Sequence, residues 1–255
     1  MSERALLFDV GNTRLKWGVL DAERITRTGS IRHETLRESG FASLTTRLPR
    51  NIDSVLVSNV AGQGFATRLA GVVGMHCDAD IHFARTERKA YGISNAYAQP
   101  RRLGVDRWVA MIGARAESKS ALIVVDAGTA VTIDALDRHG SHLGGQIIPG
   151  LHLMASSLTS DTSDIGATRK RTTDPGSGLA LFANTTGRAV QNGALCAICG
   201  AIERAVRVMR GAKMRPKIIL TGGDASRILK QLDGNVLHRP HLVLKGLAFI
   251  LQSGS

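Results

Sequence analysis

Short apolar runs alternate with longer helical patterns along the chain. The run Ala5–Asp9 is followed closely by Leu15–Leu20, and the Gly and Asn between them favour a hairpin with a tight turn. Other short apolar runs predict strands, and apolar residues spaced by three and four predict helices. The further expected strands are Ile25–Ile31, Ser54–Val60, Ile81–Arg85, Ala121–Asp126, Val131–Leu136, Gly144–Ile148 and Lys217–Leu220. The expected helices are Phe65–Val73, Val105–Glu117, Thr186–Met209 and Leu242–Leu251.

The pattern of the first half begins again in the second half. Phe8–Thr13 reads Phe-Asp-Val-Gly-Asn-Thr, and Val125–Ala130 reads Val-Asp-Ala-Gly-Thr-Ala. Each segment places an Asp and a Gly between two apolar runs, and the two lie about half a chain apart. This repeat predicts an α/β protein of two duplicated lobes around a cleft, with lobes at residues 1–118 and 119–255.

The composition is that of a globular protein. The chain has 255 residues, of which 43% are hydrophobic and 21% charged, and no apolar run approaches the roughly 18 residues of a membrane span. Met1–Arg4 does not have the layout of a signal peptide. We therefore expect a soluble, cytoplasmic protein with no membrane partner. Cys196 and Cys199 lack further ligands at zinc spacing, and we interpret them as core residues of a helix.

The net charge of +12 permits an anionic partner but does not identify one. The basic residues are scattered, and only 4% of the residues are aromatic, which argues against a nucleic-acid platform. The one tight basic cluster, Arg169–Arg171, lies in a polar stretch over residues 156–178. We interpret that stretch as a surface loop or flap beside the second lobe.

The two Asp-x-Gly turns suggest phosphate binding. A glycine lets main-chain N–H groups approach a phosphate, and Asn12, Thr13 and Thr129 can donate side-chain hydrogen bonds. Asp9 and Asp126 repel phosphate, so their expected role is to hold a cation that bridges it. One such turn alone is typical of an ordinary hairpin. The pair at matching positions favours phosphate binding.

The segment Thr221–Asp224 reads Thr-Gly-Gly-Asp and ends a predicted buried strand. Gly222 and Gly223 allow close approach by adenine, or by phosphate at a helix N-terminus. The alternative is a simple helix start with Asp224 as its N-cap. We favour nucleotide binding, because a two-lobed nucleotide clamp needs a third element of this kind.

An acidic and a basic residue, Asp106 and Arg107, stand together at the start of a predicted helix. Asp106 either complements the helix dipole or acts as general base, taking the proton from a hydroxyl that attacks the γ-phosphate of ATP. Arg107 would pair with a substrate carboxylate, because its planar fork orients such a group. The neighbouring Trp108 fits a core position.

Together these motifs resemble the type III pantothenate kinase family. They follow the family's order from about residue 5 to residue 225, so the resemblance covers nearly the whole chain. The matching motifs are Asp9-x-Gly-Asn-Thr13, Tyr97-x-x-Pro100, Gly104-x-Asp-Arg107, Asp126-x-Gly-Thr129, Gly144-Gly145-x-Ile-x-Pro-Gly150 and Thr186-x-x-Ala189-x-x-x-Gly193.

The resemblance implies a duplicated ribonuclease H-like core, the actin-like ATPase fold of the acetate and sugar kinase/Hsp70/actin superfamily. It implies ATP-dependent phosphorylation of pantothenate to 4'-phosphopantothenate, the first step of coenzyme A synthesis, by a homodimer. The expected cofactors are ATP, Mg²⁺ and a monovalent cation, K⁺ or NH₄⁺.

The resemblance also implies roles for residues, to which the motif analysis adds Gly222 and Gly223 at the nucleotide. Asp106 is the expected proton acceptor and Asp126 the ligand of the monovalent cation. Arg14 departs from the commonest pattern, and Arg14 and Lys16 either contact phosphate or are solvated hairpin residues. The expected ATP contacts are Asp9, Val10, Gly11, Asn12, Thr13, Arg14, Leu15, Lys16 and Thr129. The expected pantothenate contacts are Tyr97, Gly104, Val105, Asp106, Arg107 and Thr186.

Two other classes of function stay open. Some relatives were first described as accessory factors in gene regulation, and the net charge of +12 would suit salt-sensitive DNA binding. Against a pure regulator, the chain keeps Asp9, Asp106 and Asp126. The other alternative is a different kinase or phosphatase of the superfamily that acts on a sugar or a polyphosphate.

Overall fold

The computed structural model describes residues 4–161 and 181–254, and the chain divides into two compact units. Unit 1 comprises Met1–Lys119, Arg138–Gly144 and His241–Ser255. Unit 2 comprises Ser120–Asp137 and Gly145–Pro240. These units are defined by contacts between residues. The two lobes expected from the sequence repeat, residues 1–118 and 119–255, are a different division of the chain and stay a prediction.

Unit 1 is built on a mixed five-stranded sheet. Its strands are β1 (Arg4–Val10), β2 (Arg14–Asp21), β3 (Arg24–Arg32), β4 (Ser54–Asn59) and β5 (Asp80–Phe83). They lie in the order β3-β2-β1-β4-β5. β2 is antiparallel to both β1 and β3, β4 runs parallel to β1, and β5 runs parallel to β4.

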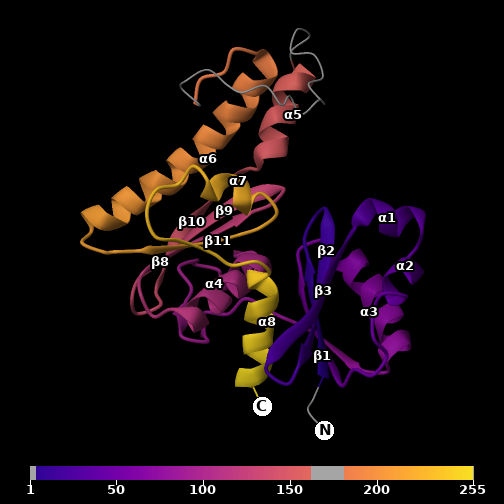
Figure 1. The fold of residues 1–255 in the computed structure, drawn as a ribbon. Coiled ribbons are helices and arrows are strands. Elements are labelled where there is room, and N and C mark those ends of the chain that lie inside the picture. Colours follow the sequence, from indigo (N-terminus) through magenta and orange to yellow (C-terminus); the bar gives the residue numbers. More distant parts are fainter. Residues whose placement is uncertain (1–3, 162–180, 255) are drawn as a thin grey trace. The chain divides into compact units, whose positions relative to one another are not determined.

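Helices cover both faces of the unit 1 sheet (Figure 1). Alternate residues of β1 point to opposite faces, and Leu6 and Phe8 pack in one core with residues of α3. Asp9 therefore points to the other face, which α4 and α8 contact. The helices are α1 (His33–Glu38), α2 (Ala42–Thr45), α3 (Gln63–Cys77), α4 (Val105–Glu117) and α8 (Leu242–Ser253), with β6 (Lys89–Ala90), β7 (Ile93–Ser94) and a 3₁₀ turn at Pro100–Arg102.

Helices α4 and α8 meet backbone to backbone through two glycines. A Cβ on Gly113 would lie 2.7 Å from the carbonyl oxygen of Leu242, and a Cβ on Gly246 would collide with the carbonyl oxygen of Val109. The Nζ of Lys245 also lies 3.0 Å from Oε1 of Glu117. Helix α8 is thus fixed to α4, the helix whose first turn contains Asp106.

Unit 2 contains a second five-stranded sheet with the same strand order. Its strands are β8 (Leu122–Ala127), β9 (Ala130–Leu136), β10 (His142–Pro149), β11 (Lys217–Thr221) and β12 (Val236–His238). The first residues of β10, up to Gly144, belong to unit 1. They lie in the order β10-β9-β8-β11-β12, with β8 antiparallel to β9 and parallel to β11. The sequence repeat therefore corresponds to a repeated sheet topology.

The helices of unit 2 are α5 (Leu151–Asp161), α6 (Thr186–Gly211) and α7 (Ala225–Leu229). Ile198 of α6 packs in one core with Val125 of β8, so Asp126 falls on the face of the sheet away from α6. Residues 156–161 were predicted to be loop, but they continue α5. The rest of that stretch, including Arg169–Arg171, lies outside the described residues.

Two further sequence expectations have clear outcomes. Cys199 is buried, as expected, but Cys196 is exposed on α6, so the prediction that both are core residues was wrong for Cys196. Trp108 is fully buried, as expected. Across residues 4–161 and 181–254, no helix has the length and apolar character needed to cross a membrane.

Candidate active site

Asp9 forms an ion pair with Lys16 at the end of the β1–β2 hairpin. The two residues are direct partners in the antiparallel register, so both side chains stand on the face that α4 and α8 contact. The Nζ of Lys16 lies 3.3 Å from Oδ2 of Asp9. Asp9 is 7% exposed, whereas a third of the Lys16 side chain remains accessible. The pair thus combines a partly accessible lysine with a buried carboxylate.

The hairpin turn itself is exposed and has free space beside its glycine. The N–H of Gly11 donates to the carbonyl of Arg14 at 3.0 Å, and a Cβ on Gly11 would make only ordinary contact with that oxygen. Gly11 is not in the left-handed region, so the bend of the chain does not itself require glycine. Its lack of a side chain instead leaves the turn open to a ligand. Asn12, Thr13 and Arg14 are exposed.

Two other predicted ATP residues serve the core. Val10 and Leu15 face each other across the hairpin and are 1% and 0% exposed. Their side chains pack in unit 1, so they can meet a nucleotide only through their backbone. The sequence analysis missed His33. Its backbone N–H donates to the carbonyl of Thr13 at 2.9 Å and so holds the end of this turn.

Asp106 lies in the first turn of α4, and its pKa is raised above the ordinary value of 3.8. Burial is the main cause, and the negative charge of Asp9 adds to it. A hydrogen bond at 2.8 Å from the N–H of Arg107 to Oδ1 of Asp106 opposes the shift. Because β1 and α4 both belong to unit 1, the structure brings these two predicted acids into electrostatic contact.

Gly104 makes room for the Asp106 carboxylate. It is the N-cap of α4, with φ −54° and ψ 133°, a backbone that other residues also adopt. A Cβ at this position would lie 2.6 Å from Oδ1 of Asp106. The glycine of the motif Gly104-x-Asp106 therefore avoids a steric clash, because the Asp106 carboxylate lies against the Gly104 backbone. Val105 is the first residue of α4.

Arg107 and Tyr97 form a second pair in unit 1. Arg107 is 5% exposed, and its Nη1 donates to the Tyr97 hydroxyl at 3.0 Å. The guanidinium carbon lies 5.8 Å from the centre of the Tyr97 ring. A buried guanidinium next to a phenol is suited to bind a carboxylate with a defined orientation.

The loop that carries Tyr97 is held by side chains from within it. Asn95 is 6% exposed, its amide donates to the carbonyls of Glu87 and Pro100, and its Oδ1 accepts the N–H of Tyr97 at 2.9 Å. Arg88 donates to the carbonyl of Tyr97 at 3.1 Å. Asn95 lies just before the Tyr97-x-x-Pro100 motif, and the sequence analysis did not identify it.

In unit 2 the matching turn is one residue shorter. Ala127 pairs with Val131 across the turn, and the N–H of Gly128 donates to the carbonyl of Ala130 at 3.0 Å. Asp126 is half-buried and stands opposite Thr132, where Asp9 has Lys16. Thus the repeat places an acid at the same point of each sheet, but only unit 1 sets a cation opposite it.

Gly150 packs against the Asp126 turn. Its N–H donates to the carbonyl of Thr129 at 2.9 Å, and a Cβ on it would collide with the carbonyls of Gly128 and Thr129. Thr129 itself is exposed. The turn therefore presents the accessible Thr129 side chain on a backbone that Gly150 holds in place.

Gly222 and Gly223 have different reasons to be glycine. Gly222 has φ +99°, and a Cβ on it would collide with the backbone of Ala127, next to Asp126. Gly223 is exposed with open space where a Cβ would be. Asp224 is at the N-cap of α7 but makes no side-chain capping hydrogen bond. Gly222 thus has a packing role, whereas Gly223 has open space beside it.

Thr186 is the first residue of α6 and is exposed in unit 2. The other predicted pantothenate residues belong to unit 1, as do Asp9 and Asp106, whereas Asp126 belongs to unit 2. The convergence of the unit 1 residues with Asp126 and Thr186 stays a prediction.

The described side chains do not form a ready-made metal cage. Within residues 4–161 and 181–254, no group of three or more His, Cys, Asp or Glu side chains could hold a metal ion. A Mg²⁺ ion in a kinase usually takes one or two carboxylates and completes its shell with water and phosphate oxygens. Single acids such as Asp9 and Asp126 fit that requirement.

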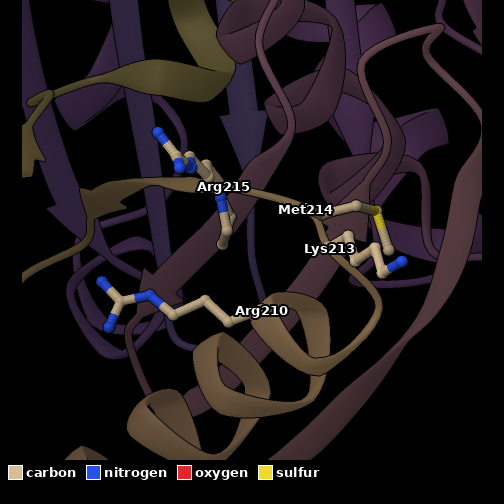
Figure 2. Close-up of a pocket in the computed structure, with 5 residues that line it drawn as sticks. Arg210, Lys213, Met214 and Arg215 are labelled. Carbon is tan, nitrogen blue, oxygen red and sulfur yellow. The ribbon is translucent and has the colours of Figure 1, made fainter.

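A cavity of about 560 Å³ lies at the C-terminal end of α6 in unit 2 (Figure 2). Its lining residues are Arg210, Lys213, Met214, Arg215 and Pro216. None of them belongs to the predicted site. The candidate active site is therefore defined by its side-chain contacts and not by this cavity.

The model of the type III pantothenate kinase family matches residues 5–208, most of the chain. This chain belongs to the type III pantothenate kinase family. The type III pantothenate kinase of Nitrosococcus oceani is 35% identical over 98% of this chain and 94% of its own length. The resemblance found in the sequence motifs is thus confirmed, and with it the assignment to a kinase family.

Solved structures confirm the fold class. A Campylobacter jejuni protein described as a Baf family transcriptional activator aligns with a TM-score of 0.61 at 20% identity and covers 98% of each chain. A Sinorhizobium meliloti protein described as a 2-dehydro-3-deoxygalactonokinase aligns with a TM-score of 0.61 at 13% identity, again over 98% of each chain. The fold is the duplicated ribonuclease H-like fold of sugar kinases and actin-like ATPases. At these identities the likeness extends to the fold alone, so it adds no support for a role in transcription.

Proposed function

We propose that this chain phosphorylates pantothenate with ATP and releases 4'-phosphopantothenate, the first intermediate of coenzyme A synthesis. Membership of the type III pantothenate kinase family supports the substrate and the reaction. The observation that carries the assignment of the site is the pair at the start of α4. Asp106, an acid with a raised pKa, directly precedes Arg107, a buried cation that contacts Tyr97.

In the proposed reaction a hydroxyl oxygen of pantothenate attacks the γ-phosphorus of ATP. The bond from that phosphorus to the β–γ bridging oxygen breaks, and ADP leaves with the bonding electrons. The hydroxyl proton passes to the Asp106 carboxylate. Burial supports this role, because a raised pKa makes the carboxylate a stronger proton acceptor than an ordinary Asp.

The proposed pantothenate site surrounds this base. Arg107 binds the pantothenate carboxylate, and the contact with Tyr97 orients its guanidinium. Gly104 and Val105 bring the backbone at the start of α4 close to the substrate. Thr186 adds a hydroxyl from the first turn of α6.

The proposed ATP site uses the two Asp-x-Gly turns. The partly accessible side chain of Lys16 supports a role at the phosphates, together with the exposed side chains of the first turn. Asp9 orients Lys16 and contributes to Mg²⁺ binding through water. The full set of proposed nucleotide contacts is Asp9, Val10, Gly11, Asn12, Thr13, Arg14, Leu15, Lys16, Thr129, Gly222 and Gly223.

Asp126 is the proposed ligand of a monovalent cation, K⁺ or NH₄⁺. This half-buried residue stands opposite Thr132 in the strand register, and the neighbouring turn has a backbone held by Gly150. A bound cation would supply positive charge near the nucleotide. Activity that rises with K⁺ in wild-type protein and is lost in Asp126→Ala would support this assignment.

We also propose a cytoplasmic homodimer. Exposed apolar side chains gather on the end of β10, on α5 and at the entry to α6, and α5 and α6 pack side by side. Such side chains are typical of an interface between copies. Sedimentation would report a dimer that Phe182→Asp weakens. The exposed apolar residues are Ile147, Leu153, Leu158, Leu181 and Phe182.

A coupled assay with ATP, Mg²⁺, K⁺ and pantothenate tests the proposed function. Purified protein should release ADP only when pantothenate is present, and mass spectrometry should detect phosphopantothenate. ADP release with a sugar acceptor, and not with pantothenate, would point to the other kinase alternative. No product, under conditions where a control pantothenate kinase works, would overturn the proposal.

A substitution of the proposed base tests the mechanism. Asp106→Asn should abolish turnover but leave ATP binding intact, because the amide keeps the shape and cannot accept the proton. Asp80→Asn, which alters an exposed acid of β5 in the same unit, is the matched control. Loss of ATP binding in Asp106→Asn would place Asp106 at the nucleotide instead.

A further inference from the structure

His142 stacks on the aromatic ring of the proposed substrate residue Tyr97. The ring centres are 6.1 Å apart, and the planes differ by 11°. His142 is 4% exposed, so its ring is enclosed by protein. Tyr97 is only half-buried, and it contacts His142 with its ring and Arg107 with its hydroxyl. A single side chain thus joins the buried histidine to the proposed carboxylate-binding arginine.

The segment that carries His142 has its own attachment to unit 1. The N–H of Ser94 donates to the carbonyl of Gly140 at 3.0 Å, and Ser94 and Ser141 form an isolated parallel bridge. Arg115 of α4 donates to the carbonyl of Arg138 at 2.9 Å. These contacts do not involve Tyr97. The backbone of the segment next to His142 is therefore held without any contribution from Tyr97.

We propose that His142 is a positioning residue for substrate binding. Its ring keeps Tyr97 in the orientation that receives the hydrogen bond from Arg107, and so keeps the Arg107 fork directed for the pantothenate carboxylate. This inference rests on the proposed function. His142 does not touch the reacting atoms, so its effect is expected in pantothenate affinity and not in the phosphoryl-transfer step.

Three variants test the role of the ring. His142→Leu keeps the bulk of the side chain but removes the flat ring, His142→Phe keeps a ring without nitrogens, and His139→Leu changes an exposed histidine of the same segment. Aromatic pairs contribute enough that losing one should raise the KM for pantothenate roughly two- to tenfold in His142→Leu. The KM for ATP and kcat should stay close to wild type. His142→Phe and His139→Leu should behave like wild type.

The stacking contact can be checked without substrate. A double-mutant cycle with His142→Leu and Tyr97→Leu, read as the free energy of unfolding, should show that the two substitutions are not additive. Additive effects would mean that the rings do not interact, which overturns the inference.

The remaining outcomes separate this inference from the proposed function. If wild-type protein phosphorylates pantothenate and His142→Leu leaves its KM unchanged, the positioning role is overturned alone. Parallel loss of kcat and of both affinities in His142→Leu would also overturn it, because that result reports a general structural role. An equal rise of the KM for pantothenate in His142→Leu and His142→Phe would overturn the claim that the flat ring positions Tyr97, because His142→Phe keeps a ring. An inactive wild-type protein overturns the proposed function, and this inference with it.

Discussion

A Cβ on Gly104 would lie 2.6 Å from Oδ1 of Asp106, so the carboxylate lies directly against the glycine backbone. Alanine suits the φ and ψ of this N-cap position, so Gly104→Ala should fold normally and displace only the carboxylate. Because a small misplacement of a catalytic group can cost up to about 100-fold, kcat should fall by roughly one to two orders of magnitude. Steady-state kinetics checks this. Gly64→Ala, at a position with open space in α3, is the control and should keep full activity.

The raised pKa of Asp106 predicts how activity depends on pH. The base works only when ionised, so kcat should fall as pH decreases through the pKa of Asp106. Burial, and to a lesser degree the charge of Asp9, place that pKa above the ordinary 3.8. A pH–rate profile should therefore show an acid limb above the range of an ordinary Asp. An acid limb at or below 3.8 would contradict the assignment of Asp106 as the base.

The same shift predicts the stability of Asp106→Asn. A carboxyl whose pKa is raised by folding favours the folded state fully below its unfolded pKa of 3.8 and loses that advantage as pH rises through its folded pKa. At neutral pH the ionised Asp106 therefore destabilises the protein. Thermal unfolding at pH 7 should give Asp106→Asn a Tm at or above that of wild type. A clearly lower Tm would mean that Asp106 has a structural role.

Lys16 and Arg14 should differ in their effect on ATP binding. Lys16 is held by Asp9 at 3.3 Å, whereas the Arg14 side chain is exposed on the turn. Hydrogen bonds to charged groups suggest that Lys16→Ala should raise the KM for ATP by roughly 10- to 100-fold. Arg14→Ala serves as the matched comparison and should change it by only a few-fold. Similar effects from both substitutions would contradict the special role of the Asp9–Lys16 pair.

The glycine contact between α4 and α8 predicts an effect on stability. Gly246→Ala would drive a Cβ into the carbonyl of Val109 and should destabilise the protein by about 1–3 kcal/mol. Gly200→Ala is the opposite case, because this residue of α6 has no neighbour within 4 Å of a Cβ. It should stabilise the protein by about 0.5–1 kcal/mol through helix propensity. Thermal or urea unfolding of the two variants checks both signs.

Much of the fold could be predicted because its signals are local. Apolar runs marked the central strands, and helical spacing marked α4 within its observed bounds, Val105–Glu117. The missed elements are short or weakly patterned, such as α2, which has four residues, and β12, which has three residues that are all half-buried. A single turn of helix, or an edge strand, buries too little apolar surface to leave a periodic pattern.

The candidate site was predictable where one motif carried the chemistry. Asp106 and Arg107 stood out as an acidic and a basic residue at the start of a helix, and Asp9 stood out through the repeat. The interaction of Asp9 with Lys16 depends on strand register, and that of Tyr97 with His142 depends on contacts between distant segments. Neither relationship has a local signal. The expectation that Cys196 is a core residue failed for a similar reason, because helical spacing alone did not tell which face of α6 is buried.

The C-terminal helix α8 belongs to unit 1, although most of that unit comes from the first 119 residues. During synthesis these residues leave the ribosome long before α8 does, so the Gly113 surface of α4 stays uncovered until Leu242–Ser253 has been made. The unit that holds Asp9 and Asp106 is therefore complete only once α8 has been added. A nascent chain that stops short of residue 242 would lack a finished site, which makes synthesis of α8 a condition for activity.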